Sequence, residues 1–212
     1  MKQTPIIIAI ILVSALSLHS QESFDLQGGL NIANLSDPGN LIEGGVWYSR
    51  LGFVTSASTN IYLTSGWFIS PGFRFVQKGT KSEWSSVSIG QVNATVTNTY
   101  LELPVYLQWE IVNFGSKLFV VGGPTYSYLL RSRMEGTSER YGYSSRDSKD
   151  DYKSYDASID LGLSIRSPIA DNIQFLATTF YSFGFIKISS RESNEQSRDV
   201  RLMIGISYSI SQ

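Results

Sequence analysis

The stretch of residues 200–210, VRLMIGISYSI, alternates between two kinds of side chain. Every second residue from Val200 to Ile210 is large and apolar, and the intervening positions are Arg201, Met203, Gly205, Ser207 and Ser209. Successive side chains of a β-strand point to opposite faces, so this period of two predicts a strand. One face of that strand is apolar, and the other is mostly small or polar and carries Arg201.

Other stretches repeat the pattern. Residues 101–111 place Glu102 and Gln108 opposite a row of leucine, valine and tryptophan, and residues 155–165 place Asp156 and Asp160 opposite isoleucine and leucine. Eight strands are predicted in all, each bounded by glycine, asparagine, serine or aspartate. They cover residues 24–34, 46–63, 67–79, 93–111, 117–130, 155–167, 172–188 and 199–211.

The connections between these segments alternate in length. Those after the first, third, fifth and seventh segments have about 11, 13, 24 and 10 residues, and the other three are short turns. Short turns on one side, long loops on the other and an even strand number are typical of outer-membrane barrels. We therefore predict an all-β protein, in which residues 21–212 form an eight-stranded antiparallel up-and-down transmembrane β-barrel.

The placement of charge tests this prediction against a soluble, lipocalin-like barrel, which would bear lysine and glutamate along its water-facing strands. Charged residues make up only 17% of the chain, and eleven of them lie between Arg131 and Lys153 and six more between Arg191 and Arg201. The strands are nearly bare of charge, which favours the membrane barrel. Aromatic residues lie mostly toward strand ends, where interfacial girdles belong. They are Trp47, Trp67, Tyr106, Trp109, Tyr126, Tyr128, Tyr181 and Tyr208.

The first twenty residues differ from the rest. Lys2 precedes an apolar stretch from Pro5 to Leu18, followed by small or polar residues around Ser20. This is the pattern of a secretory signal peptide at residues 1–20, cleaved before Gln21. The alternative is a membrane anchor, but about 14 apolar-leaning residues are fewer than the roughly 20 that span a bilayer as a helix. Export through a cleaved signal peptide to the outer membrane is expected.

Composition excludes several functions. The chain has no cysteine, its one histidine is His19 in the predicted signal peptide, and its net charge is −1. Disulfides, the usual zinc sites, imidazole-based catalysis and nucleic-acid binding are therefore not expected. We predict no catalytic residue, no cofactor and no metal site, and hence no enzyme.

Two glycine pairs and one acidic cluster are weak motifs. Gly28-Gly29 and Gly122-Gly123 lack the Lys-Ser/Thr pair of a phosphate-binding loop. The acidic cluster of Asp147, Asp150 and Asp151 lacks the spacing and the glycine of a calcium loop.

Several pieces of the chain resemble a known family. They are PGFRFVQKG at residues 71–79, YLELP at 100–104, KLFVVGGPTYSYLL at 117–130 and RLMIGISYSI at 201–210. Together they resemble the outer-membrane β-barrel domain family of the Bacteroidetes, often labelled PorT-like. The chain departs from that pattern at Gly72, where the family often has an acidic residue. The resemblance implies location and fold, a closing strand read by the barrel-assembly machinery, and, for one branch, an association with type IX secretion.

The inward-facing side chains predict a filled lumen, because an eight-stranded barrel is just wide enough for its own side chains. Arg74, Glu102, Asp160 and Arg201 are expected near mid-height, where buried charges must be paired. We predict a structural salt-bridge network there; a proton or ion path and a small-ligand site are the alternatives. The whole predicted inward set is Asp25, Gln27, Asn31, Arg74, Lys78, Glu102, Gln108, Asp156, Asp160, Arg166 and Arg201.

Two classes of function remain open. The first is a structural or interaction barrel, whose loop at residues 131–154 faces outward to meet a protein partner, a ligand or a surface glycolipid. The second is a narrow transport or secretion-associated component, in which the lumen or the periplasmic turns act. A soluble lipocalin-like binder is a weaker third possibility.

Overall fold

The computed structural model describes residues 21–36, 46–86, 90–186, 188 and 196–210. These residues hold nine strands and one short 3-10 helix. They are β1 (Gln21–Ser36), β2 (Val46–Thr64), β3 (Trp67–Ser86), β4 (Gly90–Phe114), β5 (Ser116–Ser138), β6 (Gly142–Asp147), η1 (Lys149–Asp151), β7 (Tyr155–Ala170), β8 (Ile173–Gly184) and β9 (Gln196–Ser209).

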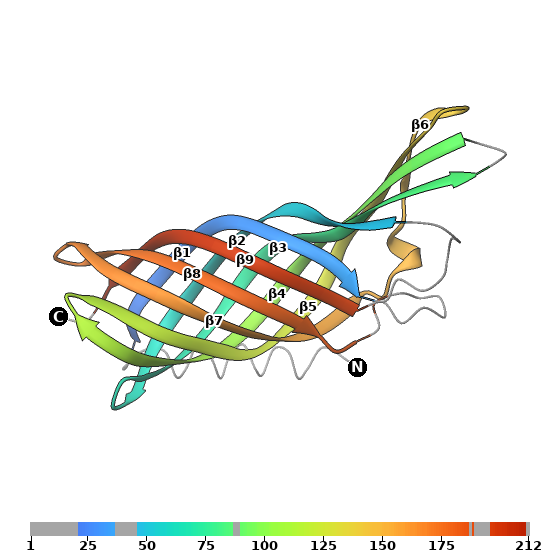
Figure 1. The fold of residues 1–212 in the computed structure, drawn as a ribbon. Coiled ribbons are helices and arrows are strands. Elements are labelled where there is room, and N and C mark those ends of the chain that lie inside the picture. The colour runs from blue at the N-terminus through green and yellow to red at the C-terminus, as the bar shows by residue number, and fades with distance from the viewer. Residues whose placement is uncertain (1–20, 37–45, 87–89, 187, 189–195, 211–212) are drawn as a thin grey trace, which may run out of the picture.

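Eight of these strands close into a ring. Their order is β4-β3-β2-β1-β9-β8-β7-β5, and β5 pairs back with β4. Every pairing in the ring is antiparallel, so the chain runs up and down around the barrel in Figure 1. The predicted eight-stranded antiparallel barrel is confirmed. The ninth strand, β6, lies outside the ring and pairs with the upper part of β5.

The outer wall of the barrel is apolar. Leu161 and Ile204 are 61% and 62% exposed there, and many other leucine, isoleucine and phenylalanine side chains point outward. On the described strands, no charged side chain is exposed on this wall between the two aromatic rims. An apolar band of this kind faces lipid in outer-membrane barrels.

Aromatic side chains mark both rims of the band. Trp67 and Trp109 stack with ring centroids 5.6 Å apart beside the short turns. Tyr128 and Tyr155 are directly paired at the opposite end. Tyr106 does not join a rim, because it is only 7% exposed and its hydroxyl lies inside the barrel. Its place in the predicted girdle is wrong, since it shares the inward parity of Glu102.

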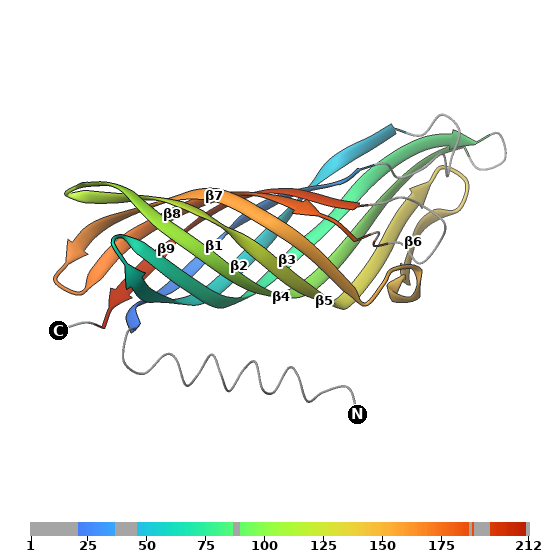
Figure 2. The same ribbon diagram turned by 90° about the horizontal axis from the view of Figure 1, so that it is seen from below.

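Strands β3, β4, β5 and β6 continue beyond the barrel rim as a paired sheet, which Figures 1 and 2 show at the end away from the C-terminus. The predicted ends at residues 79 and 130 are wrong, because β3 reaches Ser86 and β5 reaches Ser138. The loop predicted after residue 130 is largely the β5–β6 hairpin followed by η1. The period of two persists in β4 from residue 90, but one face there carries threonine and asparagine. A strand length judged from apolar residues is therefore too short.

The remaining boundaries differ little from the prediction, except that β8 ends at Gly184 and not at residue 188. The predicted signal peptide at residues 1–20 lies outside the described residues. Among the described residues, no helix has the length and apolar character needed to cross a membrane.

Candidate functional site

The four charged residues predicted at mid-height come from four different strands. Arg74 on β3 is the direct cross-strand partner of Glu102 on β4. Asp160 lies on β7 and Arg201 on β9. All four side chains are at most 1% exposed, and the barrel brings them together at its centre.

Two arginines bridge two carboxylates in this cluster. The Arg74 guanidinium lies 2.6 Å from Oε2 of Glu102 and 2.6 Å from Oδ2 of Asp160. The Arg201 guanidinium lies 2.8 Å from Oδ2 of Asp160 and 3.5 Å from Oε1 of Glu102. Each arginine therefore contacts both acids, and the four groups form a closed cycle across the lumen.

Three more charged residues extend the cycle upward. Lys78 lies 2.8 Å from Glu102, 3.4 Å from Asp199 and 3.6 Å from Asp156. Asp199 is also 2.9 Å from Arg201. Lys78 and Asp156 were predicted inside the barrel but not at this cluster, and Asp199 was not predicted there. The signal was available, because Asp199 stands two residues before Arg201 and shares its face.

Neutral groups satisfy some of the remaining lone pairs, whereas the buried Oδ1 atoms of Asp156 and Asp199 accept no hydrogen bond from the described residues. Tyr106 donates its hydroxyl to Asp160 and accepts a hydrogen bond from Arg74 at 2.6 Å. Ser127 donates to Glu102 at 3.1 Å, and Ser197 donates to Asp156 at 2.8 Å. Buried charges are tolerated when pairing and hydrogen bonding replace the lost water, and these hydroxyls supply part of that replacement.

The network holds one more negative than positive charge. Its members are the cations Arg74, Lys78 and Arg201 and the carboxylates Glu102, Asp156, Asp160 and Asp199. Because no side chain of the network is more than 2% exposed, bulk solvent screens these charges little. The arrangement can hold strands together across the lumen, and it places a dense charged barrier in the path of any solute.

A second polar cluster lies nearer the periplasmic turns. Arg166 donates to Asp25 at 3.1 Å and to Gln108 at 3.0 Å, and its guanidinium carbon sits 4.7 Å from the ring centroid of Phe119. Gln108 in turn donates to Asn60 at 2.8 Å. All five of these side chains come from different strands. This cluster therefore links five strands of the barrel across the lumen, in addition to the links made by the charged network.

Between the two clusters the lumen is nearly full. Tyr106 and Phe180 stack there with ring centroids 4.9 Å apart, and Met203 and Val121 are at most 3% exposed. A cavity of about 30 Å³ remains. A cavity of this size is large enough to hold a water molecule.

Asn31 is buried and donates to the carbonyl of Gln77 at 2.8 Å, whereas Gln27 is only half-buried. Asp147 accepts the backbone N–H of Lys149, and Asp151 pairs with Arg146. Among the described residues, no three histidine, cysteine or acidic side chains are grouped as they would be to hold a metal ion.

A ring of eight strands, an apolar outer wall and a charged, filled interior together define a class of protein, the small outer-membrane β-barrel. Residues 20–190 match the model of the family described as "Outer membrane protein beta-barrel domain". The chain belongs to this family, and its location is the outer membrane. No curated protein matches the chain.

Solved structures share the fold. The outer membrane protein OprG from Pseudomonas aeruginosa has 14% sequence identity and a TM-score of 0.52, with 92% of this chain and 98% of that chain covered. A major outer membrane protein from Thermus thermophilus has 12% identity and a TM-score of 0.51, with 91% of this chain and 100% of that chain covered. At such identities the likeness concerns the fold alone. It agrees with an outer-membrane barrel, and the family match together with the apolar outer wall argues against the soluble lipocalin-like alternative.

Proposed function

We propose that this protein is a non-enzymatic outer-membrane barrel that acts as a surface interaction protein. In this proposal the charged network keeps the lumen closed, and the sheet that rises above the barrel meets the partner. The observation that supports this proposal is the difference in solvent exposure between the lumenal network and strand β6. The lumenal network is at most 2% exposed, whereas all six residues of β6 are exposed.

The hairpin at the top of the sheet has features of a recognition surface. Tyr141 and Tyr143 are 73% and 65% exposed, far above the lipid-facing band. Tyrosine is enriched where proteins bind one another, because it offers contact area at low entropic cost and a polar tip. The outer edge of β6 also ends the sheet, so its backbone groups are available to a partner strand.

The test is crosslinking on intact cells that display the protein. The substitutions Tyr141→Ser and Tyr143→Ser are combined, and the control is Phe114→Ser, which removes an aromatic that is 92% exposed at a periplasmic turn. The crosslinked product is expected with the unmodified protein and the control, and it should be lost with the double variant. The same product in all three, or no product in any, would refute the surface role.

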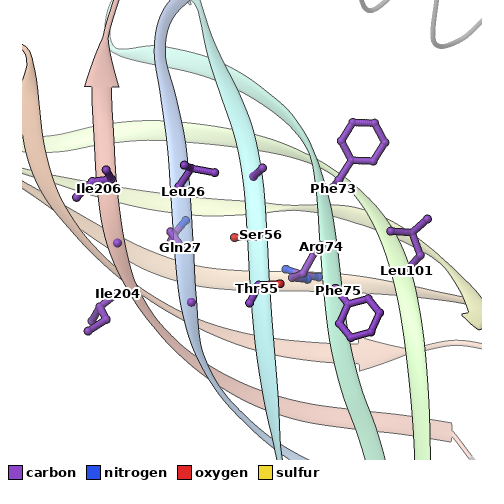
Figure 3. Close-up of a pocket in the computed structure, with 13 residues that line it drawn as sticks. Leu26, Gln27, Thr55, Ser56, Phe73, Arg74, Phe75, Leu101, Ile204 and Ile206 are labelled. Atoms are coloured by element: carbon purple, nitrogen blue, oxygen red, sulfur yellow. The ribbon is translucent and has the colours of Figure 1, made fainter. Parts of the chain in front are cut away.

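A second candidate is a narrow transport or secretion-associated component. A hollow of about 490 Å³ lies on the outer wall, and Figure 3 shows Leu26, Phe73 and Ile206 among the side chains that line it. The hollow and the lumenal cavity share several lining residues, so the wall is thin there. The shared residues are Gln27, Ser56, Ala57, Phe73 and Arg74. This observation favours a passage, and ion current across a bilayer would distinguish it from the surface role.

We also propose a narrower group within the family. The pieces YLELP at residues 100–104 and GGP at 122–124 support a PorT-like branch of the Bacteroidetes. A type IX-like secretion role would follow only for the second candidate. In either case we expect β9 to be the strand that the barrel-assembly machinery reads during insertion.

A further inference from the structure

A β-bulge on β5 turns one arginine out of the barrel. Thr99 pairs with Arg131 and Tyr100 pairs with Leu129, so β5 carries an extra residue, Leu130, at this point. Without the extra residue the side chain of Arg131 would follow Leu129, which is 0% exposed, into the lumen. With it, Arg131 is exposed and Ser132 points inward instead. Bulges commonly re-aim a side chain in this way.

A second cation is held at the same place by η1. The Lys149 ammonium donates to the carbonyl of Leu130 at 3.2 Å, the peptide group directly before Arg131. It also lies 6.0 Å from the ring centroid of Tyr128. The ammonium of Lys149 therefore lies beside the backbone that carries Arg131, although the two residues come from separate segments.

This spot lies at the edge of the lipid-facing band. Tyr128 and its direct partner Tyr155 are 48% and 49% exposed on the outer wall. Aromatic residues of this kind sit at headgroup level. Arg131 stands three residues beyond Tyr128 toward the outside, at the depth where the phosphates of outer-leaflet lipids lie.

Among the described residues, the neighbouring acids form no ion pair with the two cations. Asp147 is occupied by the backbone N–H of Lys149 at 2.9 Å, and Asp151 pairs with Arg146 at 2.8 Å. Asp150 is exposed beside them. Among the residues that the structure describes, Arg131 and Lys149 make no ion pair.

The opposite rim has no such arrangement. On the described periplasmic rim, Lys117 lies 3.2 Å from Glu110 and is thereby paired, and Asp171 is exposed. The asymmetry places unpaired positive charge on the outer side only. Basic clusters next to a bilayer attract anionic headgroups.

We propose that Arg131 and Lys149, above the Tyr128–Tyr155 pair, bind the phosphate group of a phosphorylated glycolipid in the outer leaflet. The two cations contact the phosphate, and the tyrosine rings and hydroxyls contact the attached sugar. This site depends on the outer-membrane location. It is separate from the Tyr141–Tyr143 tip, so either proposal can fail while the other stands.

The test is lipid binding by the folded barrel in detergent micelles, counted by native mass spectrometry. The probe is a diphosphorylated, acylated glucosamine disaccharide, compared with the same lipid after removal of its phosphates and with phosphatidylglycerol. Each of Arg131→Gln and Lys149→Gln should weaken binding about fivefold, since a cation near the surface contributes roughly 1 kcal/mol. The control Lys81→Gln removes an exposed cation on the extracellular part of β3, level with Glu135, and should leave binding within about twofold.

Folding of each variant is checked by its heat-modifiable band, which should be unchanged because both side chains lie outside the barrel. Unchanged affinity in both variants would overturn the proposal. An equal loss in Lys81→Gln would also overturn it, because it would show general charge attraction. Equal binding of the dephosphorylated lipid would show that the acyl chains alone are contacted. Equal binding of phosphatidylglycerol would show a phosphate contact that does not involve the sugar.

Discussion

Two ion pairs of equal length occupy opposite environments in this molecule. Arg201 and Asp160 are 2.8 Å apart in the lumen, and both side chains are 0% exposed. Arg146 and Asp151 are also 2.8 Å apart, but on the extracellular sheet, where they are 54% and 23% exposed. The two ion pairs therefore have the same N–O distance and differ only in the burial of their side chains.

This difference in burial indicates which charged residues stabilise the barrel. Water competes with the exposed pair and salt screens it, so such pairs contribute about 0–1 kcal/mol. A buried pair has lost its water, and removing one partner leaves the other charge without compensation, at a cost of about 3–5 kcal/mol. The lumen is therefore expected to be intolerant of substitution, and the sheet above it free to vary and to bind.

The largest effect is expected from Glu102→Ala. This carboxylate contacts Arg74, Lys78 and Arg201, so its removal takes an ion-pair partner from each of the three buried cations. The free energy of unfolding, measured by denaturant titration in lipid vesicles, should fall by about 3–5 kcal/mol.

The matched control is Glu83→Ala on the extracellular part of β3, where the glutamate is exposed. A surface change of this kind should alter the free energy of unfolding by no more than about 0.5 kcal/mol. Equal stability of the two variants would contradict a stabilising role for the network. If Glu102→Ala fails to insert, Glu102→Gln keeps the shape of the side chain and should show a smaller loss in the same direction.

The smallest effect is expected from Arg146→Ala. It breaks the exposed pair with Asp151, so the free energy of unfolding should fall by about 0–1 kcal/mol, and the difference should shrink further in 1 M salt. The same titration, run at low and high salt, measures both quantities. A loss as large as that of Glu102→Ala would erase the distinction between the two regions.

The barrel could be predicted from the sequence because its signals are periodic. The alternation in residues 200–210 and 101–111 fixes which side chains point inward, and the lengths of the connections fix the strand directions. Arg74 and Glu102 could be placed together because they lie at matching heights on adjacent strands. Asp199 shows the limit, since it obeys the same alternation as Arg201 but is the first residue of the predicted strand and adjoins a charge-rich segment.

The extracellular sheet could not be predicted in the same way. Its strands carry threonine, asparagine and charged residues, so the apolar signal fades while the backbone pairing continues from Arg133 to Ser138. The outward turn of Arg131 rests on a bulge, which depends on the register between β4 and β5 and has no signature in composition. Tyr106 was assigned by its residue type, although its parity places it beside Asp160.

The most direct test of the closed lumen is the conductance of the purified protein in planar lipid bilayers. With the network intact across the lumen and a cavity of only about 30 Å³ beneath it, no discrete current steps are expected. Reproducible steps of defined size from the unmodified protein would contradict a closed lumen and would favour the transport function.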